Sequence, residues 1–221
     1  MKYFEHKQGI NDMEKQQAVQ NLVDICHHVQ EKGLVSGTGG NISIKTGNVI
    51  YITPTSVALG KITDKLLSVV SIETGKPLND ITPSKEIMMH LLSYRANENI
   101  HAIIHVHSVY AAAIASMPDF IHDKTIPAYT PGYGLRVGCL PVIPYEVPGS
   151  MELAQSVATV LKERNSVLLA NHGSVVAAKN LEKAFDLIEE IEENAKLFFI
   201  TNGKANPLSR EQIQTLHEYY K

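Results

Sequence analysis

Cysteine, excess basic charge and long apolar runs are all scarce in this 221-residue sequence. Its two cysteines, Cys26 and Cys139, lie far apart and outside any CxxC pair, so we expect a reducing compartment and no disulfide. Lysine and arginine total 20 against 23 acidic residues, a balance that argues against electrostatic capture of nucleic acid. No stretch reaches the roughly 18 apolar residues of a membrane span, and the first residues lack the apolar core of a signal peptide. These absences predict a cytoplasmic protein that binds neither membrane nor nucleic acid.

The remaining composition is that of a globular protein. Hydrophobic residues make up 44% of the chain and charged residues 19%, which excludes a disordered or fibrous chain. At about 100–200 residues per domain, the length favours a single domain over residues 1–221. Ten residues are histidine, and His101, His105 and His107 fall within seven positions. We therefore look for function around this cluster.

Apolar periodicity predicts interleaved helices and strands, and hence an α/β protein. We expect a hairpin of two short strands at 42–45 and 49–52 around the turn at 46–48, which makes the sheet mixed or antiparallel. The other expected strands are 67–72, 101–107, 139–143, 167–170 and 175–178. The expected helices begin at Asn11 or Asp12, Thr82-Pro83, Ser108, Ser150 and Asn180, with one short helix in the C-terminal tail.

The strand at 101–107 predicts a metal site. His105 and His107 are two residues apart, so their imidazoles project from one face while Val106 points into the core. His172, in the turn between two predicted strands, can supply the third ligand of a catalytic zinc site. His101 lies on the same face but farther from the loop end. The alternative for the pair alone is two hydrogen-bonded histidines without a metal.

Glu86 is the candidate carboxylate beside such a metal. It lies in the first turns of the predicted helix that precedes the histidine strand. A glutamate there can also be a solvated residue favoured by the helix dipole. In an active site it would move a proton, a task that a metal-bound histidine cannot perform.

Three short segments predict contacts to an anion such as phosphate. Residues 37–41 lack the third glycine of a dinucleotide-binding loop and precede a strand, so they are not a Rossmann motif. Their backbone, with the Thr38 hydroxyl and the Asn41 amide, can cradle phosphate, although an ordinary tight turn also explains them. Residues 53–56 and the Ser84-Lys85 pair at a predicted helix start are further candidates.

The strings GTGGNISI, ITPTS, PSKE, HVH and NHG occur in the order and approximate spacing of the class II aldolase and adducin family, which this chain resembles over about residues 14 to 200. The resemblance implies a three-layer α/β/α fold with a mixed, largely antiparallel sheet. It also implies a cyclic homotetramer with active sites at subunit interfaces, and one Zn²⁺ per chain. Its metal ligands fall on His105, His107 and His172, its catalytic carboxylate on Glu86, and its phosphate contacts on Thr38, Gly40, Asn41, Thr55, Ser56 and Ser84.

Longer strings, including TPTSVALGKI, TPSKE and LLANHG, most closely resemble the 3-oxo-tetronate 4-phosphate decarboxylase branch of this family. That branch implies loss of CO₂ through a metal-bound enediolate to give dihydroxyacetone phosphate. Lys85 replaces a serine of the aldolases and is a candidate catalytic residue that orients the substrate carboxylate or holds phosphate. No tyrosine in residues 127–133 aligns with the tyrosine by which aldolases handle the aldehyde. The alternatives are an L-fuculose-1-phosphate-type aldolase and a non-catalytic adducin-like binding module.

Overall fold

The strands of the protein pair into one mixed sheet. The computed structural model describes residues 2–120 and 126–220, and within these residues the sheet has seven strands in the order β3-β2-β1-β4-β7-β6-β5. The strands are β1 (Asn41–Thr46), β2 (Val49–Ile52), β3 (Ser68–Ser71), β4 (Ala102–Val106), β5 (Val142–Ile143), β6 (Ser166–Leu169) and β7 (Gly173–Ala178). β5 and β6 run parallel, and the other described neighbours are antiparallel. The predicted largely antiparallel sheet is confirmed.

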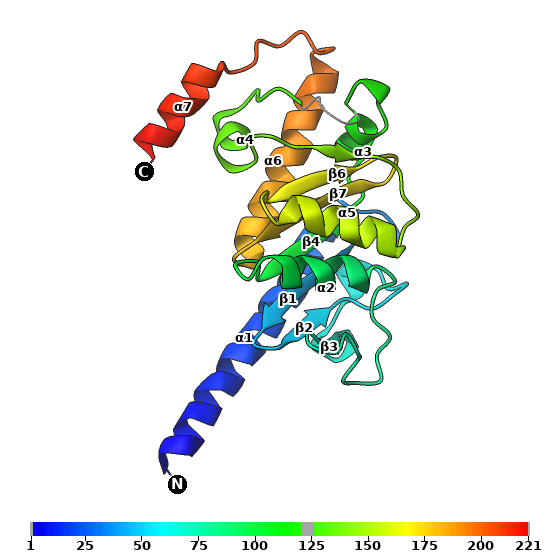
Figure 1. Ribbon diagram of the computed structural model, residues 1–221, viewed down its shortest axis with the longest axis vertical. Helices are drawn as coiled ribbons and strands as arrows, with labels where there is room; N and C mark the ends of the chain where they lie inside the picture. Colours follow the sequence, from blue (N-terminus) through cyan, green and yellow to red (C-terminus); the bar gives the residue numbers. More distant parts are fainter. Residues whose placement is uncertain (1, 121–125, 221) are drawn as a thin grey trace.

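Helices cover both faces of the sheet and make a three-layer α/β/α arrangement (Figure 1). α2 (Ile87–Ala96) packs beside α5 (Met151–Leu161) on one face. α1 (Lys2–Glu31), α3 (Val109–Ala115) and α6 (Leu181–Ile200) cover the other face. The short helices are α4 (Pro131–Arg136), α7 (Arg210–Tyr219), η1 (Leu59–Lys61), η2 (Asp64–Leu66) and η3 (Pro118–Phe120). None of the helices in the described residues is long and apolar enough to cross a membrane.

The alternation of side chains along β4 determines which face carries the histidines. Ala102, Ile104 and Val106 are buried in the core beneath α1, α3 and α6. Ile103 is buried in the core beneath α2 and α5. Because alternate strand residues share a face, His105 lies on the side of α2.

Several predicted boundaries are confirmed. In the first hairpin Thr46 pairs with Val49, which leaves a two-residue turn at Gly47-Asn48 where Gly47 adopts a φ of 58°. Ser150 and Asn180 cap α5 and α6, since their side chains accept hydrogen bonds from backbone N–H groups in the first turns. These caps fix the first residues of the two helices, which pack on opposite faces of the sheet.

Two predicted helix starts are wrong. The first helix begins at Lys2 rather than at Asn11 or Asp12, because neither residue ends the helix and the backbone continues as a helix through Gly9, Asn11 and Asp12. The helix predicted from Thr82-Pro83 begins only at Ile87. Residues 82–84 are instead extended, since the Ser84 N–H donates to the Thr53 carbonyl at 3.1 Å and residues 54 and 83 form a β-bridge. This pairing fixes the segment that leads into Glu86.

Other differences concern caps and short elements. Ser108 precedes α3 as predicted, but its side chain makes no cap hydrogen bond; the Glu192 carboxylate accepts from the N–H groups of Tyr110 and Ala111. α4 is absent from the predicted elements, although Pro131 at its first turn and the Thr130 cap are ordinary helix-start signals. The strand predicted at 139–143 is shorter in the structure, where only Val142–Ile143 form β5.

Candidate active site

Loop segments far apart in sequence meet at one end of the sheet. Asn41, the first residue of β1, lies opposite His105 near the end of β4, and β2 ends beside β1. β7 begins next to the end of β4, since Ser174 lies opposite Val106. The segments at 37–40, 53–56 and 171–173 therefore surround the end of the histidine strand.

Three imidazoles converge at this end. The Nε2 atom of His105 lies 3.0 Å from Nε2 of His107 and 3.3 Å from Nε2 of His172. One ligand atom from each of the three histidines falls within 4.8 Å of the others, so the cluster can hold a metal ion. His105 is fully buried, whereas His101 is exposed at the start of β4 and outside the cluster.

The protonation of the histidines suits metal binding. His105 donates from Nδ1 to the Ser174 carbonyl at 2.9 Å, and this hydrogen bond directs its Nε2 toward the cluster. Burial, followed by the neighbouring His105, lowers the pKa of both His107 and His172 to about 4. The rings of His107 and His172 are therefore neutral near pH 7. Three imidazole nitrogens directed at one point are a ligand set that suits a zinc ion.

Glu86 completes the group. Its Oε2 lies 3.3 Å from His105 Nε2 and accepts a hydrogen bond of 2.8 Å from Asn41 Nδ2. Its Oε1 lies 3.6 Å from His172 Nε2 and has no hydrogen-bond partner within the described residues, although it is buried. Burial raises the pKa of Glu86, but His105 and the hydrogen bond from Asn41 outweigh burial and hold the pKa well below its ordinary value. The carboxylate is thus ionised at rest and has one oxygen available.

Glycines allow the loops to approach the histidine strand. A Cβ at Gly40, whose φ is 75°, would lie 2.7 Å from the His105 carbonyl oxygen. A Cβ at Gly173 would lie 2.3 Å from the Val106 carbonyl oxygen, and one at Gly39 would lie 3.0 Å from His107 Nδ1. The close approach predicted for Gly40 is therefore made to β4 itself; an approach to phosphate stays a prediction.

The predicted phosphate contacts lie at the same end of the sheet. Residues 53–56 follow β2 and pair with residues 82–84, which brings Thr55 and Ser56 near Ser84. Ser84 is buried, and its hydroxyl accepts from the Glu86 N–H at 3.3 Å. Thr38 is exposed on the loop before β1. The structure brings these segments together, and their role toward phosphate stays a prediction.

Asn41 and Lys85 differ in their surroundings. Asn41 is buried, and its amide contacts Glu86 through nitrogen and His90 through oxygen. Lys85 is exposed beside Glu86, and its contact with the substrate stays a prediction. Tyr133 is fully buried in the core, with no hydrogen-bond partner for its hydroxyl among the described residues.

The buried polar residues behind Glu86 include His90 and Ser43, which are not among the site residues predicted from the sequence. His90 is four residues after Glu86, a spacing that places two residues on one helix face, and Ser43 is two residues after Asn41 on one strand face. His90, Ser43 and Asn41 are buried and hydrogen-bonded to one another. The spacing was a signal that could have identified this group.

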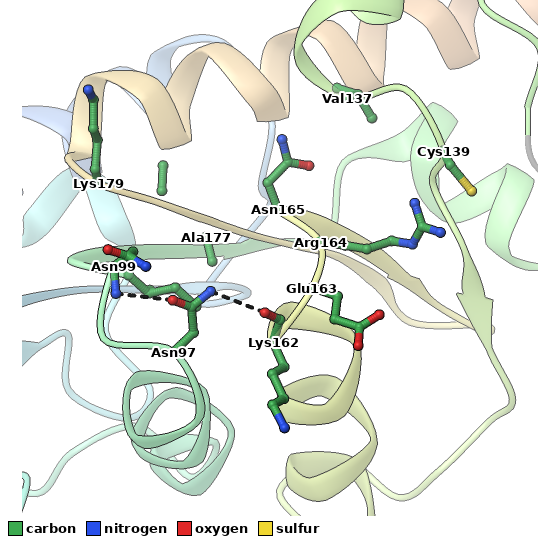
Figure 2. Close-up of a pocket in the computed structure, with 12 residues that line it drawn as sticks. Asn97, Asn99, Val137, Cys139, Lys162, Glu163, Arg164, Asn165, Ala177 and Lys179 are labelled. Carbon is green, nitrogen blue, oxygen red and sulfur yellow. Dashed lines mark hydrogen bonds between the residues drawn. The ribbon is translucent and has the colours of Figure 1, made fainter.

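A separate pocket of about 410 Å³ lies at the other end of β4 and β7 (Figure 2). It is lined by Ile100, just before β4, and by Ala178 at the end of β7. Asn97 also lines it, accepts a hydrogen bond from the Asn99 N–H and donates one to the Lys162 carbonyl (Figure 2). None of the predicted site residues lines this pocket.

Comparison with known proteins shows which family the chain belongs to. Residues 20–199 match the family described as the Class II Aldolase and Adducin N-terminal domain. The chain is 38% identical to 3-oxo-tetronate 4-phosphate decarboxylase of Haemophilus influenzae over 83% of this chain and 87% of that protein. It is 37% identical to L-fuculose phosphate aldolase of Methanococcus maripaludis over 83% of this chain and 96% of that protein.

A solved structure shows the same fold. The crystal structure of YgbL from Klebsiella pneumoniae superposes with a TM-score of 0.86 at 33% identity, covering 91% of this chain and 98% of that one. The chain therefore belongs to the class II aldolase and adducin family, as the resemblance predicted. Its relatives are named as decarboxylases and aldolases, which places the chain among the carbon–carbon lyases of this family.

Proposed function

We propose that this protein is a zinc-dependent lyase that decarboxylates 3-oxo-tetronate 4-phosphate to dihydroxyacetone phosphate and CO₂. The observation that carries the proposal is the convergence of three imidazole nitrogens with a buried glutamate, one oxygen of which has no hydrogen-bond partner among the described residues. The decarboxylase relatives at 35–38% identity support the substrate.

The histidines would hold the metal through their Nε2 atoms. When bound, Zn²⁺ supplies a positive centre that accepts the negative charge developing on the substrate oxygens. His105 is held in the correct tautomer by the Ser174 carbonyl, and His107 and His172 complete the set. A carboxylate is not needed as a fourth ligand, which leaves Glu86 for proton chemistry.

Glu86 would handle the proton. Loss of CO₂ breaks the C1–C2 bond of the substrate and leaves its electron pair at C2, which must gain a proton to give the product. Because the lowered pKa keeps Glu86 ionised at rest, the carboxylate would first receive a proton from water and then deliver it to C2, which leaves the C2 hydroxyl intact. Its unpartnered oxygen makes this exchange possible.

Polar groups around the cluster would bind the two charged ends of the substrate. The hydroxyls of Thr38, Thr55, Ser56 and Ser84 are the candidate phosphate contacts. Lys85, exposed beside Glu86, would orient the carboxylate. An overly strong carboxylate contact would stabilise the ground state and slow the reaction, so an orienting role suits Lys85 better than tight binding.

The second candidate is an aldolase acting on L-fuculose 1-phosphate, favoured by the aldolase relative at 37% identity. An assay for dihydroxyacetone phosphate from each substrate decides between them. We expect turnover of the oxo acid and little of fuculose 1-phosphate. The reverse preference would identify an aldolase, and no turnover of either substrate would reject both assignments.

We also propose that the enzyme is a cytoplasmic homotetramer with active sites between subunits. Large apolar side chains are exposed near the site, including Val109, two residues after His107, at 69% exposure. Tyr145 and Val147 are also exposed. Sedimentation equilibrium is expected to give four times the chain mass, and a monomer would contradict the proposal.

A further inference from the structure

A chain of buried hydrogen bonds leads from Glu86 into the interior between β1 and α2. Asn41 Nδ2 lies 2.8 Å from Glu86 Oε2, and His90 Nε2 lies 2.6 Å from Asn41 Oδ1. Ser43 Oγ then lies 2.7 Å from His90 Nδ1 and 2.8 Å from the Tyr94 hydroxyl. Asn41, Ser43, His90 and Tyr94 are all buried.

The direction of each hydrogen bond in this chain is determined. A carboxylate only accepts, so Asn41 presents its NH₂ group to Glu86 and its carbonyl oxygen to His90. That oxygen also only accepts, so Nε2 of His90 carries a hydrogen. Burial and the neighbouring His105 lower the pKa of His90 to about 3, so the ring is neutral and Nδ1 accepts from the Ser43 hydroxyl. Ser43 in turn accepts from Tyr94, and every donor in the chain points toward Glu86.

This chain makes the two oxygens of Glu86 different. Oε2 is anchored by the Asn41 amide, whereas Oε1 has no hydrogen-bond partner among the described residues and lies on the side of His172. We infer that His90 is a positioning residue: by fixing the Asn41 amide, it anchors Oε2 of Glu86 and leaves Oε1 as the oxygen that transfers the proton. The inference deepens the proposed function and rests on it for its kinetic consequence.

A purely structural role for His90 is the competing explanation, since a buried histidine that links α2 to β1 also stabilises the fold. The two explanations predict different effects of a His90 substitution on turnover when Glu86 is also substituted. A positioning residue acts through Glu86, so its substitution costs nothing further once Glu86 can no longer transfer a proton. A structural defect lowers turnover in either background.

Two substitutions of His90 separate its two hydrogen bonds. In His90→Gln, the side-chain amide reaches the place of Nε2 and can still donate to Asn41. In His90→Asn, the shorter amide reaches the place of Nδ1 and can pair with Ser43 but not with Asn41. We expect His90→Asn to lower kcat about 10–100-fold with KM changed less than about threefold, and His90→Gln to retain most of kcat.

The decisive comparison places His90→Asn in the Glu86→Gln background, with metal content and thermal unfolding measured for every variant. The inference predicts one metal per chain throughout and no further loss of kcat in the double variant. Equal losses for His90→Gln and His90→Asn, or a loss in the double variant as large as in the single one, would overturn it.

A crystal structure of the metal-loaded His90→Asn variant gives a readout independent of any substrate. We expect the Asn41 amide to leave Oε2 of Glu86 in this variant and to stay on it in the wild type and in His90→Gln. An unchanged Asn41–Glu86 contact in His90→Asn would overturn the inference even if turnover fell. If the wild type acts on neither substrate, the proposed function fails while this structural test still decides the positioning role.

Discussion

At the scale of single residues, our proposal assigns the proton transfer to the Glu86 carboxylate. Glu86→Gln keeps the size of the side chain but removes its titratable proton, so we expect kcat to fall by about 10²–10⁴. Metal content, measured by elemental analysis, is expected to stay at one per chain, because the three histidines remain. A variant that loses its metal would show instead that Glu86 is primarily a ligand.

Lys85 is the residue that separates the two candidate reactions. A charge-assisted hydrogen bond to the substrate carboxylate contributes about 1.5–3 kcal/mol, so Lys85→Ser is expected to lower kcat/KM for the oxo acid roughly 10–150-fold. Any activity toward fuculose 1-phosphate, which has no carboxylate, is expected to change little.

Lys162→Ser is the matched control for Lys85→Ser. Lys162 is also exposed, but it lines the pocket at the opposite end of the sheet (Figure 2). We expect this control to leave both activities unchanged. Equal losses on the two substrates in Lys85→Ser would mean that Lys85 contacts the phosphate group instead.

At the scale of the elements, the junction between the loop before β1 and strand β4 depends on a close approach. Gly40→Ala combines a left-handed φ of 75° with a Cβ 2.7 Å from the His105 carbonyl. Gly47→Ala, in the hairpin turn, has a similar φ of 58° and nothing within 4 Å of the added carbon. We expect Gly47→Ala to lower the free energy of unfolding by about 1 kcal/mol and Gly40→Ala by about 2–4 kcal/mol.

Urea unfolding of the two glycine variants measures this difference. We also expect weaker metal binding in Gly40→Ala only, because the clash displaces the backbone of a metal ligand. Equal destabilisation of the two variants would show that the loop tolerates displacement from β4.

Part of the fold and of the candidate site could be predicted from local sequence patterns. Strand alternation correctly placed His105 and His107 on one face, because a period of two follows from backbone geometry. The approach of His172 depends on β7 lying next to β4, an order that no local pattern specifies. The late start of α2 follows from pairing between residues 53–55 and 82–84, a long-range contact that overrides the helix-start preference of proline.

The hydrogen-bond partners of the buried polar residues Asn41 and His90 are harder to predict from the sequence. The sequence predicts that Asn41 contacts phosphate, from its place in a glycine-rich loop and from the family resemblance, and that role stays a prediction. In the structure its amide lies on Glu86, because β1 and α2 approach each other closely enough to bury it. Which partner a buried amide finds depends on the packing of two elements, and a single sequence holds no measure of that packing.

At the scale of the whole molecule, buried neutral histidines make stability depend on pH. The pKa of His90 is lowered to about 3, and those of His107 and His172 to about 4, against about 6.5 in the unfolded chain. Between those values the unfolded state binds more protons, so the free energy of unfolding of the metal-free protein falls as the pH falls below about 6.5. The contribution of Glu86, whose pKa is also lowered, is lost only below about pH 4.3.

Urea unfolding of the metal-free protein between pH 7 and 5 therefore isolates the histidines. Each one that is neutral when folded and protonated when unfolded contributes a slope of at most about 1.4 kcal/mol per pH unit. His90→Gln removes one such group and is expected to give a shallower slope. An unchanged slope in that variant would show that His90 is protonated in the folded protein.

The most direct test of the account follows CO₂ and dihydroxyacetone phosphate together, with 3-oxo-tetronate 4-phosphate as the substrate. Three samples are compared: the metal-loaded protein, the protein stripped of metal, and His107→Ala. We expect one CO₂ for each dihydroxyacetone phosphate in the first sample. One divalent metal per chain is expected to restore activity to the stripped protein, and His107→Ala is expected to be inactive. Full activity after complete removal of the metal, or dihydroxyacetone phosphate formed without CO₂, would contradict it.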